Sequence, residues 1–231
     1  MLLIYFCFSN RTPGMELSDK IDLIAEELDD YRNMDLEMTM SSSFQSHSIP
    51  LLHMISRFAP EVEVIFLDTG FHFPETILFR DRMVRELGLN LRILRSPVPK
   101  QLQMDRQGYF LFSSDPDRCC AINKTLPMQN ILREYDVWIS GLRRDQNAHR
   151  QGLKKTEHTR EGVIRYYPIL EWNSRDIWEY RVKYDLPPHP LEERGFSSIG
   201  CEPCTRSDLE GRGGRWFGQK KTECGLHLNK D

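Results

Sequence analysis

The sequence predicts an α/β fold in which helices cover both faces of a mostly parallel, doubly wound sheet. Residues 62–67 are rich in β-branched side chains, a helical pattern runs from Pro74 to near Gly88, and residues 91–94 form another apolar run. Strands that alternate with helices favour parallel pairing through right-handed crossovers. In such a sheet, ligands bind beyond the carboxyl ends of the strands.

The remaining elements follow the same alternation. A helix is expected near the start, because apolar residues recur every three or four positions at Leu17, Ile21, Ile24, Leu28 and Tyr31. Residues 36–43 predict a strand, followed by a polar turn and a helix over 51–58. Residues 119–133 are helical in pattern, and 137–140 read as a further strand. Regularity fades beyond Pro187.

Charge is distributed unevenly along the 231 residues, whose formal net charge is −3. Residues 141–165 carry seven bases against three acids, which suits a small phosphorylated ligand. This stretch is too short, and the chain too acidic, for duplex nucleic acid to be the expected partner. With 39% hydrophobic residues, the composition is that of a globular protein.

The N-terminal apolar run covers only residues 1–8, far fewer than the ~20 that span a bilayer, and lacks a basic flank. We therefore expect no membrane association and a cytoplasmic location. Met15 precedes the first helix and is a candidate start, which makes residues 1–14 an extension without function. Structural disulfides are rare in the cytoplasm, so the cysteines need a metal or redox explanation.

Four of the six cysteines occur as two close pairs, which can surround one soft metal centre: Cys119, Cys120, Cys201 and Cys204. Zinc sites usually space their ligands C-x₂₋₄-C, so the adjacent pair suits a cubane iron–sulfur cluster better than zinc. The alternative is two buried cysteines and a chance C-x-x-C.

A solitary cysteine, Cys224, follows near the C-terminus. Lys220, Lys221 and His227 favour its thiolate, the nucleophilic form, whereas Glu223 is expected to oppose it. Taken alone, such a cysteine is more often inert than catalytic.

Several groups are suited to an anion. The turn from Ser43 to Ser46 offers hydroxyl, amide and backbone donors but lacks the glycine and lysine of a Walker loop. Guanidinium groups that bind phosphate or sulfate oxygens are available at Arg143, Arg144, Arg212 and Arg215. Without other features, a serine-rich turn is usually just a turn, and a basic stretch is as often a solvated surface.

Together these motifs resemble the assimilatory sulfonucleotide reductases, specifically the bacterial iron–sulfur adenylyl-sulfate reductases. The resemblance covers residues 41–227 and is carried by the Ser-rich loop, Leu67–Gly70 with Pro74–Thr76, Cys119-Cys120-x-x-x-Lys124, Gly141–Gln146, Ile199–Thr205 and Glu223–His227. The stretch Gln45–Ser48 departs from the family, many of whose members have small and acidic residues there.

The resemblance implies an adenine-nucleotide α-hydrolase-like fold of the PP-loop type. It implies a [4Fe–4S] cluster on Cys119, Cys120, Cys201 and Cys204, within a nucleotide- and cluster-binding domain over 15–205. It also implies a catalytic C-terminal segment over 206–231, with Cys224 as nucleophile. The expected substrate-binding residues are Ser43, Phe44, Gln45, Ser46, Asp68, Lys124, Arg143, Arg144, Arg212, Arg215 and His227.

The implied reaction reduces adenosine 5′-phosphosulfate to sulfite and AMP in sulfate assimilation. Cys224 forms an S-sulfonate, which thioredoxin or a similar dithiol discharges. The 3′-phosphorylated nucleotide is the nearest alternative substrate. Alternatives from other classes are a PP-loop enzyme of ATP-dependent thiolation and a zinc-bearing binding module. Whether the chain forms a homo-oligomer stays open.

Overall fold

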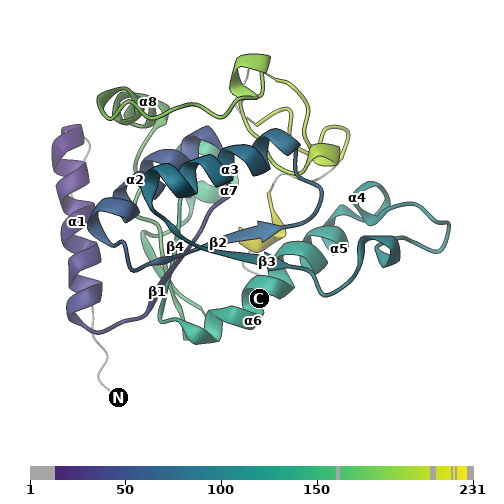
Figure 1. The fold of residues 1–231 in the computed structure, drawn as a ribbon, viewed down its shortest axis with the longest axis horizontal. Coiled ribbons are helices and arrows are strands. Elements are labelled where there is room, and N and C mark those ends of the chain that lie inside the picture. The colour runs from purple at the N-terminus through teal and green to yellow at the C-terminus, as the bar shows by residue number, and fades with distance from the viewer. Residues whose placement is uncertain (1–13, 160–161, 209–211, 220, 222, 228–231) are drawn as a thin grey trace.

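One six-stranded sheet forms the centre of the computed structural model, which describes residues 14–159, 162–208, 212–219, 221 and 223–227 (Figure 1). The strand order is β3-β2-β1-β4-β6-β5. All neighbours pair in parallel except β5 and β6. The predicted mostly parallel sheet is therefore confirmed. The strands are β1 (Met38–Ser41), β2 (Glu63–Asp68), β3 (Asn90–Arg95), β4 (Val137–Ser140), β5 (Thr156–His158) and β6 (Ile164–Tyr166).

Helices cover both faces of the sheet, as predicted for a doubly wound fold. One face carries α1 (Leu17–Asn33), α2 (Ile49–Phe58), α3 (Pro74–Leu87) and α8 (Ser174–Lys183). The other carries α6 (Leu126–Ile131). The shorter helices are α4 (Leu111–Ser114), α5 (Pro116–Cys120) and α7 (Ala148–Gln151).

Alternation along the strands divides the core into two layers. Val64 and Phe66 of β2 pack toward α1, α2 and α3, whereas Ile65 and Leu67 pack toward α6. Leu226, near the C-terminus, belongs to the second layer and is 9% exposed. The end of the chain thus contributes to the core beneath the sheet.

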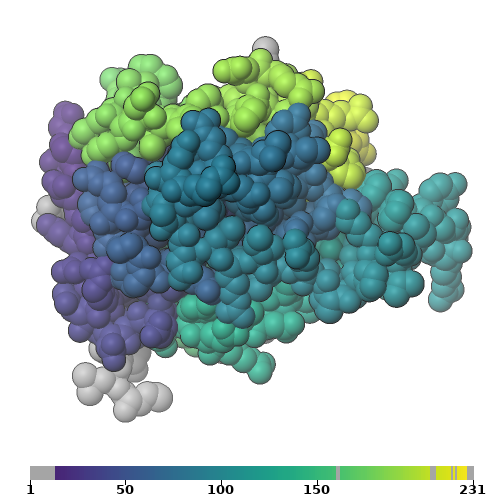
Figure 2. All heavy atoms as spheres, viewed as in Figure 1, coloured from purple at the N-terminus to yellow at the C-terminus, as the bar shows by residue number. Residues whose placement is uncertain are grey.

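Between β3 and α5 the chain leaves the sheet and forms a projection that includes α4 (Figures 1 and 2). Phe110 and Phe112 stack with ring centroids 5.3 Å apart, and Phe71 packs edge-on against Phe112. These rings tie the projection to the loop after β2. The chain then returns through α5, which carries the paired cysteines.

The predicted helices and strands up to β4 are confirmed, with ends shifted by a few residues. The helical stretch over 119–133 is broken into α5, a π-turn (Ala121–Thr125), α6 and a 3₁₀ turn (Leu132–Glu134). The sequence reasoning missed β5, β6 and α8. Both strands are three residues long, and α8 is highly charged. No described helix is long and apolar enough to cross a membrane.

Phe44 anchors the turn after β1 in the core. It is fully buried, packs edge-on against Phe66 at 5.8 Å and adopts a left-handed backbone conformation with φ of 54°. Its backbone N–H donates to the Ser42 hydroxyl at 3.1 Å. The ring therefore sets the position of the neighbouring serines by packing.

Replacing this ring should destabilise the protein. We expect Phe44→Ala to lower the free energy of unfolding by about 3–5 kcal/mol, because the mutation leaves a cavity against Phe66. Urea denaturation measures the change. The control is Tyr109→Ala in the projection, where the side chain is 65% exposed and the change should stay within about 0.5 kcal/mol. A loss below 1 kcal/mol for Phe44→Ala would contradict the anchoring role.

Candidate active site

A pocket with about 1040 Å³ of empty space, part of which is open solvent, lies at the carboxyl ends of β1, β2 and β4. Ser41, Leu67 and Ser140, at or near the ends of these strands, line it. This is the edge at which a doubly wound sheet binds ligands.

The Ser-rich turn forms one wall of this cavity. Ser43 and Gln45 line it, and the Gln45 side chain accepts a hydrogen bond from the Ile199 N–H at 3.1 Å. Ser46 is buried, and its hydroxyl accepts from the His189 N–H at 2.9 Å. The turn is therefore fastened to the segment that leads to Cys201.

Besides the buried Ser46, four predicted substrate-binding residues do not line the cavity. Phe44 belongs to the core, and Asp68 accepts from the Gly70 N–H of its own turn and from Arg95 at the end of β3. Arg143 is 2% exposed and pairs with Asp145 at 3.0 Å. Arg144 forms an ion pair with Glu171 at 2.7 Å. These four side chains already have partners within the protein.

Three predicted cations do line the cavity: Lys124, Arg212 and Arg215. The Arg215 guanidinium packs over Trp216 at 4.5 Å and lies against Gly200. A Cβ at Gly200 would stand 2.3 Å from Arg215 Nη2, so glycine is what admits the guanidinium here. Burial, and then the nearby Arg150 charge, lower the pKa of Arg212 to about 10, so it stays protonated at neutral pH.

The two predicted cysteine pairs border a second, smaller cavity of about 370 Å³, which Cys119, Cys120, Cys201 and Cys204 line together. Polar neighbours approach two of these sulfurs. The Thr69 hydroxyl lies 3.3 Å from Cys201 Sγ, and Asn123 Nδ2 donates to Cys119 Sγ at 3.6 Å. Among the described His, Cys, Asp and Glu side chains, no three converge closely enough to ligate one metal ion.

Lys124 and Arg215 line both cavities. Burial opposes the charge of the Lys124 amine, but the electrostatic attraction of the nearby Cys201, Cys224 and Cys120 sulfurs outweighs it and raises the pKa of Lys124. Cys224 lies in the wall of the larger cavity. A hydrogen bond from the Cys120 thiol, opposed by burial and aided by the Lys124 charge, lowers the pKa of Cys224 well below its ordinary value.

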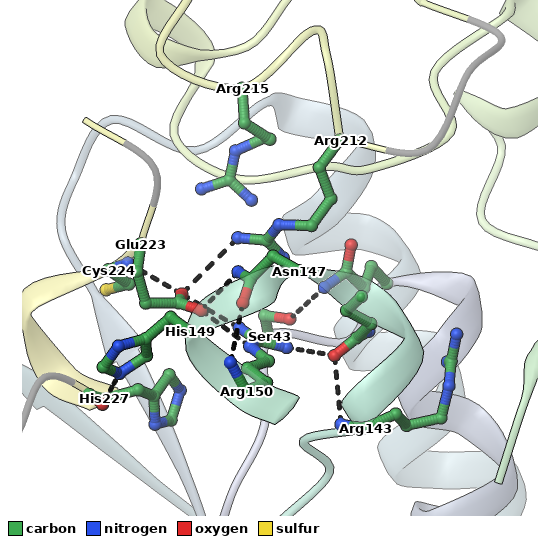
Figure 3. A network of polar contacts seen from close by, with 12 residues as sticks. Ser43, Arg143, Asn147, His149, Arg150, Arg212, Arg215, Glu223, Cys224 and His227 are labelled. Atoms are coloured by element: carbon green, nitrogen blue, oxygen red, sulfur yellow. Dashed lines mark hydrogen bonds and ion pairs between the residues drawn. The ribbon is translucent and has the colours of Figure 1, made fainter. Parts of the chain in front are cut away.

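The site also contains a buried ion pair that sequence reasoning did not assign (Figure 3). Glu223 accepts from Arg150 Nε at 2.6 Å and from Arg150 Nη2 at 2.9 Å, and from Asn147 at 2.9 Å. The available signals were the basic stretch that contains Arg150 and the acid beside Cys224. We expected Glu223 to oppose the thiolate, but Arg150 neutralises its charge.

His227 completes this wall. Its ring stacks on Trp138 with centroids 6.1 Å apart, and its carbonyl accepts from His149 Nε2 at 3.3 Å. Burial, and then the Arg150 charge, lower the pKa of His227 to about 4. Burial also lowers the pKa of His47 and of His72 to about 4, aided by Arg143 and Lys124 respectively. These rings are neutral at neutral pH.

The fold and the site define a doubly wound α/β protein whose cavities at the carboxyl edge of the sheet are rich in cysteine and arginine. The chain belongs to the phosphoadenosine phosphosulfate reductase domain family, whose model matches residues 37–207.

Relatives span most of the chain. A protein of Geobacillus thermodenitrificans named adenosine 5′-phosphosulfate reductase is 39% identical over 206 residues, covering 86% of each chain. A Bacillus cereus protein of the same name is 40% identical, covering 85% of this chain and 86% of its own. One from Gloeobacter violaceus, named phosphoadenosine 5′-phosphosulfate reductase, is 38% identical, covering 83% of this chain and 82% of its own.

Solved structures share the fold. The phosphoadenylyl-sulfate reductase of Candida auris, in a phosphate complex, superposes with a TM-score of 0.66 at 21% identity, covering 83% of this chain and 98% of its own. The FMN adenylyltransferase of Candida glabrata gives 0.59 at 16% identity, covering 83% and 65%. The predicted PP-loop-type fold is thereby confirmed.

The neutral cavity histidines predict acid sensitivity. Their folded pKa of about 4 lies below the unfolded value of 6.5, so the unfolded state binds more protons between these values. Stability should be complete above pH 6.5 and fall toward pH 4 by roughly 1.4 kcal/mol per pH unit for each histidine. Urea unfolding at a series of pH values measures the slope. His47→Asn should reduce the slope of stability against pH by the contribution of one histidine. The control is His158→Asn, at an exposed position, which should leave the slope unchanged. Equal slopes in the wild type and both variants would contradict the assignment.

Proposed function

We propose that this chain is an adenylyl-sulfate reductase that converts adenosine 5′-phosphosulfate to sulfite and AMP. The observation that carries the proposal is the position of Cys224: its thiol lies in the wall of a cavity at the nucleotide-binding edge of the sheet, beside Lys124 and Arg212. The names of the relatives from Geobacillus and Bacillus support the same reaction.

In the proposed reaction, the Cys224 thiolate attacks the sulfur of the sulfate group. The new S–S bond forms as the bond from sulfur to the phosphate oxygen breaks, and AMP leaves with both electrons of that bond. Two anions must approach, so cations have to neutralise the oxygens first. Lys124, Arg212 and Arg215 are the cavity cations suited to this role.

A dithiol protein such as thioredoxin then completes the proposed cycle. Its thiolate attacks Cys224 Sγ and releases sulfite, which leaves a mixed disulfide that the second thiol resolves. The dithiol supplies two electrons, which lower the oxidation state of the transferred sulfur from +6 to +4. Five described cysteines are free, which suits the reducing environment of the cytoplasm, where we propose that the enzyme works.

We further propose a [4Fe–4S] cluster in the smaller cavity. Thiolate ligands would come from Cys119, Cys120, Cys201 and Cys204, which border this one space. The adjacent pair Cys119-Cys120 suits the separated irons of a cubane better than one zinc ion, whose ligands are usually spaced C-x₂₋₄-C. When bound, the cluster would supply fixed charge and position, and Cys120 would have no proton to donate to Cys224. The Lys124 amine would then be the main support of the Cys224 thiolate.

Sulfite release with reduced thioredoxin tests the proposed function. The unphosphorylated nucleotide should give the higher kcat/KM, because an added 3′-phosphate brings up to two more negative charges and needs a further cationic partner. A clear preference for the 3′-phosphorylated substrate would favour the alternative for which the Gloeobacter relative is named. No sulfite from either nucleotide would contradict the proposal. Cys224→Ser is the matched control, and it should bind nucleotide but release no sulfite, since an O-sulfonate is not discharged by thiol exchange.

Colour and iron content test the proposed cluster. Anaerobically purified protein should be brown, with about four irons per chain. Cys204→Ser should bleach it, whereas Cys224→Ser should leave the visible absorption unchanged. Stoichiometric zinc in a colourless, active protein would contradict the cluster.

A further inference from the structure

Glu223 is among the most deeply buried charged groups of the molecule, with 1% of its side chain exposed. Its carboxylate accepts hydrogen bonds from Arg150, Asn147 and the backbone N–H of Cys224 at 2.8 Å, and Arg212 approaches to 3.5 Å. Burial disfavours the charge, but the Arg150 guanidinium holds the pKa of Glu223 well below its usual range. A buried carboxylate with this many donors is fully compensated.

All these side-chain donors except Arg212 come from one short segment, the helix α7 and its N-cap Asn147. His149 of the same turn donates to the carbonyl of His227 (Figure 3). Residues 223–227, here called the tail, therefore rest on α7 at both ends. Other described anchors of the tail are the hydrogen bond between the Cys120 and Cys224 side chains, the packing of Leu226 in the apolar layer with Met128, and the His227 ring on Trp138.

We propose that Glu223 and Arg150 form a latch that docks the tail on α7 and thereby positions the Cys224 thiol for attack. The proposal rests on the proposed function, in which Cys224 is the nucleophile. Glu223 and Arg150 are positioning residues, since they act through the backbone of the tail.

The backbone of Cys224 is held on both sides, by the latch at its N–H and by the following turn at its carbonyl. Its N–H is held by the Glu223 carboxylate, and its carbonyl accepts from the His227 N–H at 3.0 Å. With both groups occupied, the direction of the Cα–Cβ bond is set and only rotation about χ1 remains to the thiol. Glycine follows at 225, where an added Cβ would contact Thr125 and Cys120, so the tail lies close against the π-turn.

The latch also divides the cavity cations into two groups. Glu223 is the only acid among the described lining residues, and its charge is neutralised by Arg150. Lys124 and Arg215 remain for an anionic ligand, together with Arg212, which stands at the longer distance of 3.5 Å from Glu223. A carboxylate next to the nucleophile would otherwise repel that ligand, so the ion pair makes the acid compatible with the site.

The test uses the complete, cluster-loaded protein and the variants Glu223→Gln and Arg150→Lys, with Glu179→Gln as control. Glu179 pairs with Arg175 on the exposed face of α8. Three quantities are measured: amide hydrogen exchange of residues 224–227, the single-turnover rate of S-sulfonate formation without a dithiol, and AMP affinity. Loss of charged hydrogen bonds should speed exchange and slow S-sulfonate formation by roughly tenfold to a hundredfold in both latch variants. AMP affinity should change far less than the rate of S-sulfonate formation, because Lys124 and Arg215, the cavity cations outside the latch, are unaltered.

A double variant separates the effect of the latch from the cost of leaving the Arg150 charge buried without its partner. Glu223→Gln with Arg150→Met removes both charges, so tail exchange should remain fast if the latch is what holds the tail. Restored slow exchange in this double variant would overturn the proposal. So would unchanged exchange in both single variants, or a parallel loss of AMP binding and global stability, which would mark the pair as part of the fold. If wild-type protein forms no S-sulfonate, the proposed function fails, and the hydrogen exchange still decides whether the latch exists.

Discussion

Four cations share one partly enclosed cavity at the carboxyl edge of the sheet, and like charges repel far more strongly there than in water. The rest of the site offsets this repulsion. Glu223 neutralises Arg150, the Trp216 ring packs against the two arginines of the 212–216 segment, and cysteine sulfurs lie around Lys124. Burial lowers the pKa of Arg212, and residual repulsion from Arg150 lowers it further. What is left uncompensated is positive charge suited to a compact anion.

The fold supplies the rigid frame that keeps such charges together. Parallel strands end at one edge, so turns far apart in sequence meet there without long connections. Phe44 fixes the first turn from below, and hydrogen bonds from Ile199 and His189 fasten it from the side. The cavity therefore has walls from the start, middle and end of the chain.

Local pattern predicted the frame well, because β-branched runs and the apolar stripe of α1 determine structure through nearby residues. It failed at β5 and β6, which are too short to show a period: β6 forms by pairing with β4, and β5 by pairing with β6. Motifs identified the cysteines and the cavity arginines Arg212 and Arg215. They did not reveal that Asp145 and Glu171 already engage Arg143 and Arg144, nor that Arg150 meets Glu223 across 73 positions, because partners are a property of the folded chain.

The wall shared by the two cavities has a thermodynamic consequence. Lys124 and Arg215 face both spaces, so any negative charge that enters one space draws on the same cations as a ligand in the other. Such sharing is a coupling free energy, and coupling is reciprocal: whatever one ligand does to the affinity of the second, the second does to the first. Two competing anions would bind anticooperatively, whereas a group that fixed the amine in place would help its neighbour bind. The two spaces thus form a single linked binding system.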